Sequence, residues 1–342
     1  MTYKLSKKNP FKNDVIFIDG LWGTGKSLIA PIVCAMEGVE KQKFEYIYEY
    51  VCVLVHLKKI EADAADTLLK IYADLSQYNN LIGREVNLRW NDASGPSNNT
   101  DTFKYILRMF SKEGDTIVKD INERNLALNI LSHLIFPVSK PLVKAYGSRL
   151  KIIEMVRHPV YMVQHWYSYL SRFDGEREFT ICFDYNRQKV PWFAETWQDK
   201  FVEMSIMDRS LHSIIFLYEL LFESLSTLNK ESTNTMVITF ESFVMNTENE
   251  LKRLQDFLGR SHSAKIKKIL KQQKVPRNLL SQGIGRAGYG WKKSDADSEK
   301  KEYDHKLEFI RKKASENTLL EFDKLIKKYN DKWPSILSDY HQ

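Results

Sequence analysis

The segment IDGLWGTGKSLIAPIV, residues 18 to 33, constrains the fold more than any other part of the chain. The apolar run VIFID (15–19) predicts a buried strand, and the residues from Lys26 to Met36 have the apolar spacing of a helix. Between them Gly20 is followed by four residues and then by Gly25-Lys26-Ser27, the spacing of a phosphate-binding loop. The first N–H groups of such a helix have no partners within it, and the helix dipole favours an anion there. We therefore expect a phosphate site at this turn.

Further short apolar runs alternate with segments of helical spacing along the chain. This alternation is typical of a parallel sheet covered by helices on both faces. We predict an α/β fold, a P-loop three-layer sandwich with a central parallel sheet flanked by helices. The run YEYVCVLV (48–55) is compatible with either a strand or a helix. The other predicted strands are DTIVK (115–119), KIIEMV (151–156) and MVITF (236–240), and the other predicted helices span Ala62 to Leu75, Asn125 to Leu134 and Leu211 to Leu228.

We predict one P-loop domain over residues 1–293, with a helical and loop insertion at about 56–112. Residues 77–100 are rich in Asn, Gly and Ser, which indicates a loop or lid. Residues 171–200 are polar and aromatic and resemble a second insertion. From residue 294 to 342 charged residues recur at helical spacing, which predicts a charged C-terminal helical extension packed on the same domain.

Composition limits the function classes. The net charge of +7 suits an anionic ligand, but no nucleic-acid recognition motif accompanies it, so we expect no nucleic-acid partner. No stretch approaches 18 uninterrupted apolar residues and no signal peptide is recognisable, so we expect a cytoplasmic protein without a membrane span. The three cysteines, Cys34, Cys52 and Cys182, have no metal-binding spacing and fit a reducing compartment. We expect no metal site.

The phosphate loop alone leaves the phosphorylated donor open. A kinase or ATPase needs an acid for magnesium at the end of another strand, and Asp120, just after DTIVK, is a candidate for that role. An ATP-dependent P-loop kinase is therefore one interpretation of the first third of the chain. A non-catalytic nucleotide-binding protein of the same fold is another.

Three later segments narrow the choice. They are IIEMVRHPVYMVQHWYSYL (152–170), MVITFESFVMNTENELKRLQDFLGR (236–260) and GIGRAGYGWKK (283–293). In this order behind a P-loop, they resemble the sulfotransferase family that uses 3′-phosphoadenosine 5′-phosphosulfate (PAPS). The resemblance covers roughly residues 14 to 293 and implies transfer of a sulfuryl group from PAPS to a hydroxyl of an acceptor, with a carbohydrate or small metabolite favoured. It implies a nucleotide donor and a hydroxyl-bearing acceptor as partners and requires no metal.

The resemblance also implies roles for individual residues. Arg157 falls on the arginine that binds the 3′-phosphate of the donor, and Lys119 on a lysine that follows the second core strand near the donor phosphates. Together with Lys26, Lys119 would stabilise charge on the transferring group. The residues implied for the 5′-phosphosulfate loop are Gly23, Thr24, Gly25, Lys26, Ser27 and Leu28, and those implied for a late loop over the 3′-phosphate are Arg286, Ala287, Gly288 and Trp291.

The physical chemistry of the donor supports two anion sites. A nucleotide with phosphate at both ends of its ribose needs two separated cationic groups, and a P-loop supplies only one. Arginine suits the second because its guanidinium holds a phosphate by paired hydrogen bonds. Arg157 follows a predicted strand, and open α/β sheets bind ligands at the carboxyl ends of their strands.

The sequence departs from the family pattern at three places. Gly23 occupies a position that is usually basic, and Lys26 stands where ATP-binding P-loops place their lysine. His165 replaces a serine that usually contacts the 3′-phosphate. Some branches place a histidine base just after the Lys119 position, where this chain has Ile121. For the general base we therefore consider Glu49, in a region where other branches use a glutamate, and Asp120.

Overall fold

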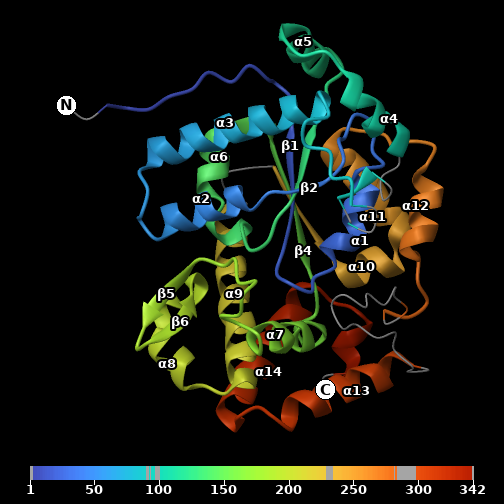
Figure 1. The fold of residues 1–342 in the computed structure, drawn as a ribbon. Coiled ribbons are helices and arrows are strands. Elements are labelled where there is room, and N and C mark those ends of the chain that lie inside the picture. The colour runs from blue at the N-terminus through green and yellow to red at the C-terminus, as the bar shows by residue number, and fades with distance from the viewer. Residues whose placement is uncertain are drawn as a thin grey trace.

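The computed structural model describes residues 3–89, 92, 94–96, 101–228, 234–280, 282 and 298–340. Its centre is a five-stranded parallel sheet of order β2-β3-β1-β4-β7, which confirms the predicted α/β fold class (Figure 1). The strands are β1 (Val15–Asp19), β2 (Lys43–Phe44), β3 (Leu128–Leu131), β4 (Leu150–Val156) and β7 (Thr235–Thr239).

The central strand β1 forms because apolar residues can be buried on both of its faces. All five of its residues are buried, as are all four of β3. β1 pairs with β3 on one side and β4 on the other, with Val15 opposite both Leu128 and Leu150. Because the neighbours of β1 come from later in the chain on both sides, the carboxyl ends of β1, β3 and β4 meet at a point where the strand order reverses, the usual ligand site of such sheets.

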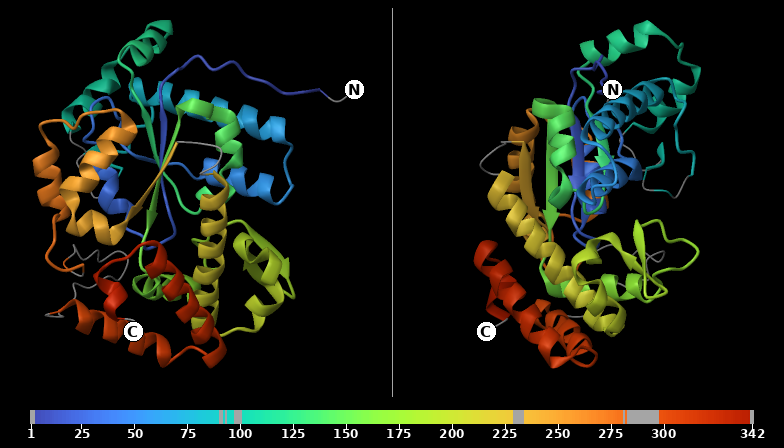
Figure 2. Two further views of the ribbon diagram at one scale, coloured as in Figure 1. Left: turned by 180° about the vertical axis from the view of Figure 1, so that it is seen from behind. Right: turned by 90° about the vertical axis from the view of Figure 1, so that its left-hand side faces the viewer.

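Helices cover both faces of this sheet. The right-hand view of Figure 2 shows α2 (Tyr46–His56) and α3 (Ala62–Leu81) on one side and α9 (Ile206–Leu228) with the C-terminal helices on the other. Helix α1 (Lys26–Val33) packs against α12 (Ile266–Gln273). The remaining helices of the sheet domain are α4 (Thr102–Leu107), η2 (Arg108–Phe110), α5 (Asp115–Glu123), η3 (Phe136–Val138), α6 (Lys140–Tyr146), η4 (Gly147–Arg149), η5 (Pro159–Tyr161), α7 (Val163–Leu170), α10 (Phe240–Met245) and α11 (Thr247–Leu258).

The strand predictions for 15–19, 151–156 and 236–240 are confirmed within a residue. The strand predicted at 115–119 is wrong, because DTIVK lies in helix α5 on the surface and only Ile121 of this helix is buried. The helix predicted at 125–134 is also wrong, since residues 128–131 form β3. The ambiguous run 48–55 belongs to helix α2.

Burial between two strands explains why 128–131 is a strand. β3 pairs with β1 and β2 along its two edges, and helices cover both faces of the sheet, so side chains on either face of β3 are buried. Its one polar residue, Asn129, has its amide nitrogen 3.3 Å from both Cys34 Sγ and the Glu40 carbonyl oxygen. These partners lie far away in sequence, and a sequence pattern cannot indicate them.

The two predicted additions to the sheet are present as structured segments. Residues in the predicted 171–200 insertion form the hairpin β5 (Cys182–Tyr185) and β6 (Gln188–Pro191), followed by η6 (Trp192–Trp197) and α8 (Gln198–Glu203). The C-terminal part forms α13 (Glu299–Arg311), α14 (Glu316–Lys332) and η8 (Ile336–Tyr340), and α14 packs against α9. In the described part of the chain, no helix is both long and apolar enough to cross a membrane.

Candidate active site

The predicted phosphate loop connects β1 to α1 and requires glycine at two positions. Gly20 has a φ of +141°, and a Cβ there would lie 2.3 Å from the Met155 carbonyl oxygen. Gly25 has a φ of +95°, and a Cβ there would lie 2.4 Å from the ring of Phe240. Only glycine is tolerated without displacing these neighbours. The loop is therefore pressed against both β4 and the turn after β7.

Carbonyl oxygens of the loop accept hydrogen bonds from loop side chains and from Trp166 and Arg157. The Thr24 N–H is itself bonded to Leu21 O at 3.3 Å, so the N–H groups that can meet an anion are those at the start of α1. No side chain caps the start of α1. The arrangement is a cradle of N–H groups suited to an anion. The bonds run from Lys26 Nζ to Gly20 O and Leu21 O (3.0 Å for the second), from Thr24 Oγ1 to Leu21 O (2.8 Å), from Trp166 Nε1 to Trp22 O (3.1 Å) and from Arg157 Nη1 to Gly23 O (3.0 Å).

Arg157, predicted from its place after β4, lies directly against this loop. Besides the bond to Gly23, its guanidinium lies 4.0 Å from the ring centroid of Phe240. Its backbone N–H donates to the Tyr218 hydroxyl at 3.2 Å, which fixes the turn. Its Nε is buried and has no hydrogen-bond partner among the described residues. Burial lowers the pKa of Arg157 from its ordinary value, yet it stays a cation.

The acidic turn after β7 supports the turn that carries Arg157. Glu241 is buried and accepts hydrogen bonds from the His158 backbone N–H and from the Tyr329 hydroxyl, each at 2.9 Å. It thereby joins the turn after β4 to helix α14. Phe240, the preceding residue, packs against Gly25 and Arg157. Phe240 and Glu241 thus support both the phosphate loop and the turn that carries Arg157.

A cluster of buried ionisable groups lies beneath the loop. Burial lowers the pKa of Lys26 to about 8, although three carboxyl groups counteract it. Of these, Asp19 and Glu154 are neighbours on paired strands and fully buried. Burial raises the pKa of both, and in Glu154 the negative charge of Asp19 raises it further. The third, Glu49, has its pKa raised to about 8 by burial and by Asp19.

His133, which the sequence analysis missed, lies at the same place. It comes two residues after the end of β3, and its ring stacks on Tyr46 with centroids 6.0 Å apart and planes 9° apart. The ring centroid of Trp22, a loop residue, lies 6.4 Å from that of His133. The distance from His133 Nδ1 to Glu49 Oε2 is 3.9 Å, and 18% of the His133 side chain is exposed.

Burial, Lys26 and His165 together lower the pKa of His133 well below its ordinary value, so it is neutral at pH 7. We assigned the histidine position after the second core strand to Ile121 because we took 115–119 as that strand. The strand next to β1 is β3, and the histidine that follows it is His133. The signal in the sequence was the apolar run before Ser132-His133, which we had assigned to a helix.

His165 lies beside the loop and carries no charge at neutral pH. A Cβ on Gly23 would lie 3.6 Å from the His165 Cβ, so the two residues are in contact. Burial, and then the nearby cations Lys26 and Arg157, lower the pKa of His165 to about 4. A neutral imidazole still offers one N–H donor.

Lys119 and Asp120 lie away from this cluster. Both are exposed on α5, which Figure 1 shows at the opposite end of the molecule from α7, the helix that contacts the loop through Trp166. The Oδ2 atom of Asp120 lies 3.7 Å from Nη1 of Arg124, which is one turn further along the chain. The structure therefore does not bring either residue to the loop. Arg286, Ala287, Gly288 and Trp291 lie outside the described residues.

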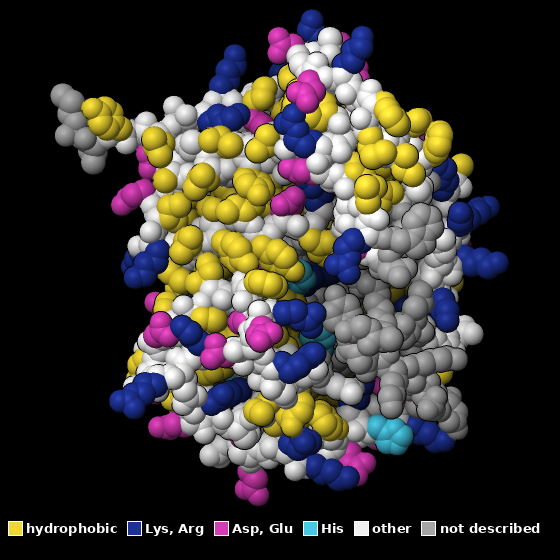
Figure 3. Space-filling model, viewed as in Figure 1, with side chains coloured by type: hydrophobic (Ala, Val, Ile, Leu, Met, Phe, Trp, Pro, Cys, Tyr) yellow, Lys and Arg dark blue, Asp and Glu magenta, His cyan; other side chains and the backbone are white. Residues whose placement is uncertain are grey.

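The surroundings of the cluster are aromatic and cationic. Figure 3 shows histidine side chains recessed near the centre of this face, with hydrophobic side chains gathered over α2 and α3 beside them. Tyr46 is 45% exposed, so its ring is open to solvent next to His133. Within the described ranges, no group of three or more His, Cys, Asp or Glu side chains is arranged to hold a metal ion.

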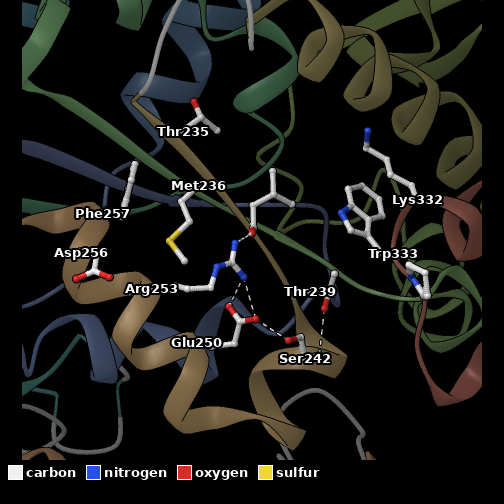
Figure 4. Close-up of a pocket in the computed structure, with 12 residues that line it drawn as sticks. Thr235, Met236, Thr239, Ser242, Glu250, Arg253, Asp256, Phe257, Lys332 and Trp333 are labelled. Atoms are coloured by element: carbon white, nitrogen blue, oxygen red, sulfur yellow. Dashed lines mark hydrogen bonds and ion pairs between the residues drawn. The ribbon is translucent and has the colours of Figure 1, made fainter.

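A separate cavity of about 700 Å³ lies along the free edge of β7 (Figure 4). Helix α11 and the end of α14 form its walls. Figure 4 shows Arg253, Glu250 and Ser242 joined there by hydrogen bonds and an ion pair. None of the loop residues lines this cavity. It is therefore distinct from the candidate active site.

The family model of the sulfotransferase domain matches residues 25–280. No curated protein matches the chain. The chain is similar to the solved sulfotransferase domain from the Synechococcus PCC 7002 olefin synthase, with 12% identity, 96% of this chain and 98% of that chain covered, and a TM-score of 0.43.

Two further solved structures are similar to the chain. One is sulfotransferase STF1 from Mycobacterium tuberculosis H37Rv, with 12% identity, 76% of this chain and 71% of that chain covered, and a TM-score of 0.37. The other is a sulfotransferase domain from the curacin biosynthetic pathway, with 14% identity, 74% and 76% coverage, and a TM-score of 0.36.

Proposed function

Since the chain belongs to the sulfotransferase family, we propose that it transfers a sulfuryl group from PAPS to a hydroxyl of an acceptor. The observation that carries this proposal is the position of Arg157. Its guanidinium touches the phosphate loop, and its buried Nε has no partner among the described residues. A buried donor left without a partner is unfavourable, which a phosphate at this place would relieve.

The phosphate loop with Lys26 and the separate Arg157 fit the two phosphate groups of PAPS. The N–H groups at the start of α1 would hold the 5′-phosphosulfate, the buried Lys26 ammonium would add positive charge from beneath the loop, and Arg157 would hold the 3′-phosphate. When bound, PAPS supplies the sulfuryl group and a bisphosphate leaving group. Lys26 and the loop N–H groups would stabilise the negative charge that develops on the departing phosphate oxygen.

We propose His133 as the general base. As the acceptor oxygen forms its bond to sulfur and the bond from sulfur to the 5′-phosphate breaks, the hydroxyl proton moves to the His133 imidazole. The imidazole is neutral and so has a nitrogen lone pair for this proton, although the burial and cations that keep it neutral also make it a weaker base. Glu49 is less suited to this role at neutral pH, because with a pKa of about 8 it already carries a proton. Its Oε2 lies 3.9 Å from His133 Nδ1, beyond hydrogen-bonding distance.

For the acceptor we propose a carbohydrate or small metabolite with a free hydroxyl. The support is the exposed ring of Tyr46 beside His133. Such a ring offers a flat apolar surface on which a sugar or other ring can stack while its hydroxyl meets the imidazole.

Nucleotide binding measured by calorimetry tests the proposal. We expect adenosine 3′,5′-bisphosphate (PAP) to bind more tightly than AMP, because only PAP has the 3′-phosphate that meets Arg157. Arg157→Ala should remove this preference, with a loss for PAP of about 10- to 100-fold and little change for AMP. Tighter binding of ATP with magnesium than of PAP would reject the proposal and favour the kinase interpretation. Preference for PAP without release of PAP from PAPS would favour a non-catalytic binding protein.

A further inference from the structure

A second arginine shares the aromatic ring that supports Arg157. Arg277 lies in the segment after α12, and its guanidinium carbon is 5.4 Å from the Phe240 ring centroid, compared with 4.0 Å for Arg157. The same ring contacts the loop at Gly25. Two guanidinium groups from distant parts of the chain therefore lie around one side chain next to the phosphate loop.

Among the described residues, neither arginine forms an ion pair. The charge of Glu241 acts on Arg157, whereas only burial and the charge of Arg157 act on Arg277. Burial, followed by repulsion from Arg157, lowers the pKa of Arg277 to about 10. Like charges held together in a partly buried place raise the free energy of the folded protein. The folded protein therefore holds two mutually repelling arginines, Arg157 and Arg277, next to the phosphate loop.

The backbone around Arg277 holds its guanidinium in place. The Arg277 N–H donates to the Val244 carbonyl at 2.8 Å, which ties the segment to α10. The side-chain Nε donates to Lys274 O at 3.0 Å and Nη1 to Leu280 O at 3.2 Å. Carbonyl oxygens carry no net charge, so these bonds fix the group without neutralising it.

We propose that Arg277 is a second arginine for the 3′-phosphate of the donor, and that it acts with Arg157 to select a doubly charged phosphate over a hydroxyl. This inference rests on the proposed function. The family resemblance assigns this phosphate to Arg157 and the late loop and gives no role to Arg277. A phosphate monoester carries nearly two negative charges at neutral pH, so two fixed guanidinium groups match its charge and number of oxygens.

The test compares PAP with AMP in wild type and in Arg277→Gln. We expect Arg277→Gln to weaken PAP binding by about 10- to 100-fold while AMP binding changes by less than about threefold, so that the preference for PAP falls. Arg277→Lys should retain part of the preference, since it keeps the charge but not the planar group. Lys271→Gln, on the exposed face of α12, is the matched control for loss of one positive charge and should leave both affinities unchanged.

The two nucleotides separate a ligand role from a structural one. If Arg277 only stabilises its own turn, Arg277→Gln will lower the melting temperature and weaken PAP and AMP equally, and that outcome overturns the inference. A wild-type protein that does not prefer PAP rejects the proposed function instead. A wild-type preference that Arg277→Gln leaves intact rejects only the role of Arg277.

Discussion

His133 and Glu49 lie side by side, yet the protein environment changes their proton affinities in opposite directions. Burial and nearby cations lower the pKa of His133, whereas burial and Asp19 raise that of Glu49 to about 8. At neutral pH the histidine is therefore unprotonated and the glutamic acid holds its proton. Residue type alone would have favoured the carboxylate as base. The environment of each side chain reverses that choice.

His133→Ala should abolish most of the sulfuryl transfer without affecting donor binding. We expect kcat to fall by about 10² to 10⁴, the usual contribution of a general base, and PAP affinity to change by less than about threefold. His305→Ala, on the exposed side of α13, is the control histidine. Turnover of PAPS with a responsive acceptor and PAP calorimetry measure the two effects. An unchanged kcat would exclude His133 as the base.

Glu49→Gln should alter the pH dependence of stability. The pKa of Glu49 is raised from 4.5 to about 8, so between these values the folded protein holds a proton that the unfolded chain has lost. The contribution of Glu49 to stability therefore falls as pH rises through this window. Glutamine does not titrate. The free energy of unfolding of the variant should therefore increase relative to that of wild type as the pH rises from about 5 to 8. Urea unfolding at several pH values measures this, and parallel curves would contradict it.

At the level of elements, a buried ion pair joins the segment before β2 to η2. Glu40 is fully buried and accepts bonds from both terminal nitrogens of Arg108, at 2.6 and 2.8 Å. Burial raises the pKa of Glu40, but the hydrogen bonds and charge of Arg108 outweigh it and lower the pKa to about 2. This pair thus attaches part of the predicted insertion to the sheet domain. Its stabilisation is present above about pH 4.5 and is lost as pH falls towards 2.

Arg108→Met should destabilise the protein strongly, because it leaves the Glu40 carboxylate buried without its partner. We expect a loss of about 3–5 kcal/mol in the free energy of unfolding. Arg84→Met removes an arginine from an ion pair with Glu113 whose two side chains are 51% and 65% exposed, and it should cost less than about 1 kcal/mol. Chemical denaturation of both variants gives the comparison. Equal losses would show that burial does not decide the contribution of these pairs.

At the level of the whole molecule, the C-terminal helices contact the candidate active site. Tyr329 of α14 bonds to Glu241 under the Arg157 turn. Glu299 at the start of α13 is buried and accepts bonds from the Leu280 backbone at 2.7 Å and from the Tyr161 hydroxyl. Both contacts reach residues near Arg157. We therefore expect residues 294–342 to fold with the sheet domain rather than separately.

Deletion of residues 294–342 should prevent stable folding. It would remove Tyr303, Phe322 and Tyr329 and expose the apolar surface that these buried side chains cover. Full-length protein should unfold in one cooperative transition that PAP shifts to higher temperature. Circular dichroism during heating tests both statements. A truncated chain that unfolds cooperatively and still binds PAP would contradict the prediction.

A feature of this protein could be predicted from the sequence where the residues that form it are close together along the chain. β1 and its loop were predictable because an apolar run, the glycines and Lys26 lie within 13 residues of one another. Arg157 was predictable because it directly follows a strongly apolar strand. The error at 115–119 arose because packing overrides the strand preference of a β-branched run: Ile117, Val118 and Ile121 of α5 pack in a small apolar cluster. This error displaced the assignments of Lys119, Asp120 and the histidine position.

The order of residues along the chain was thus sufficient to predict the glycine-rich turn after β1, three of the five strands of the central sheet, and the position of Arg157 after β4. The position of β3, the approach of His133 to Glu49, and the grouping of Arg277 with Arg157 around Phe240 arise from packing between segments far apart in sequence. Burial then sets the charge of each group in the site. These contacts and this burial exist only once the chain has folded, because they depend on enclosure by distant residues and not on the identity of neighbours along the chain.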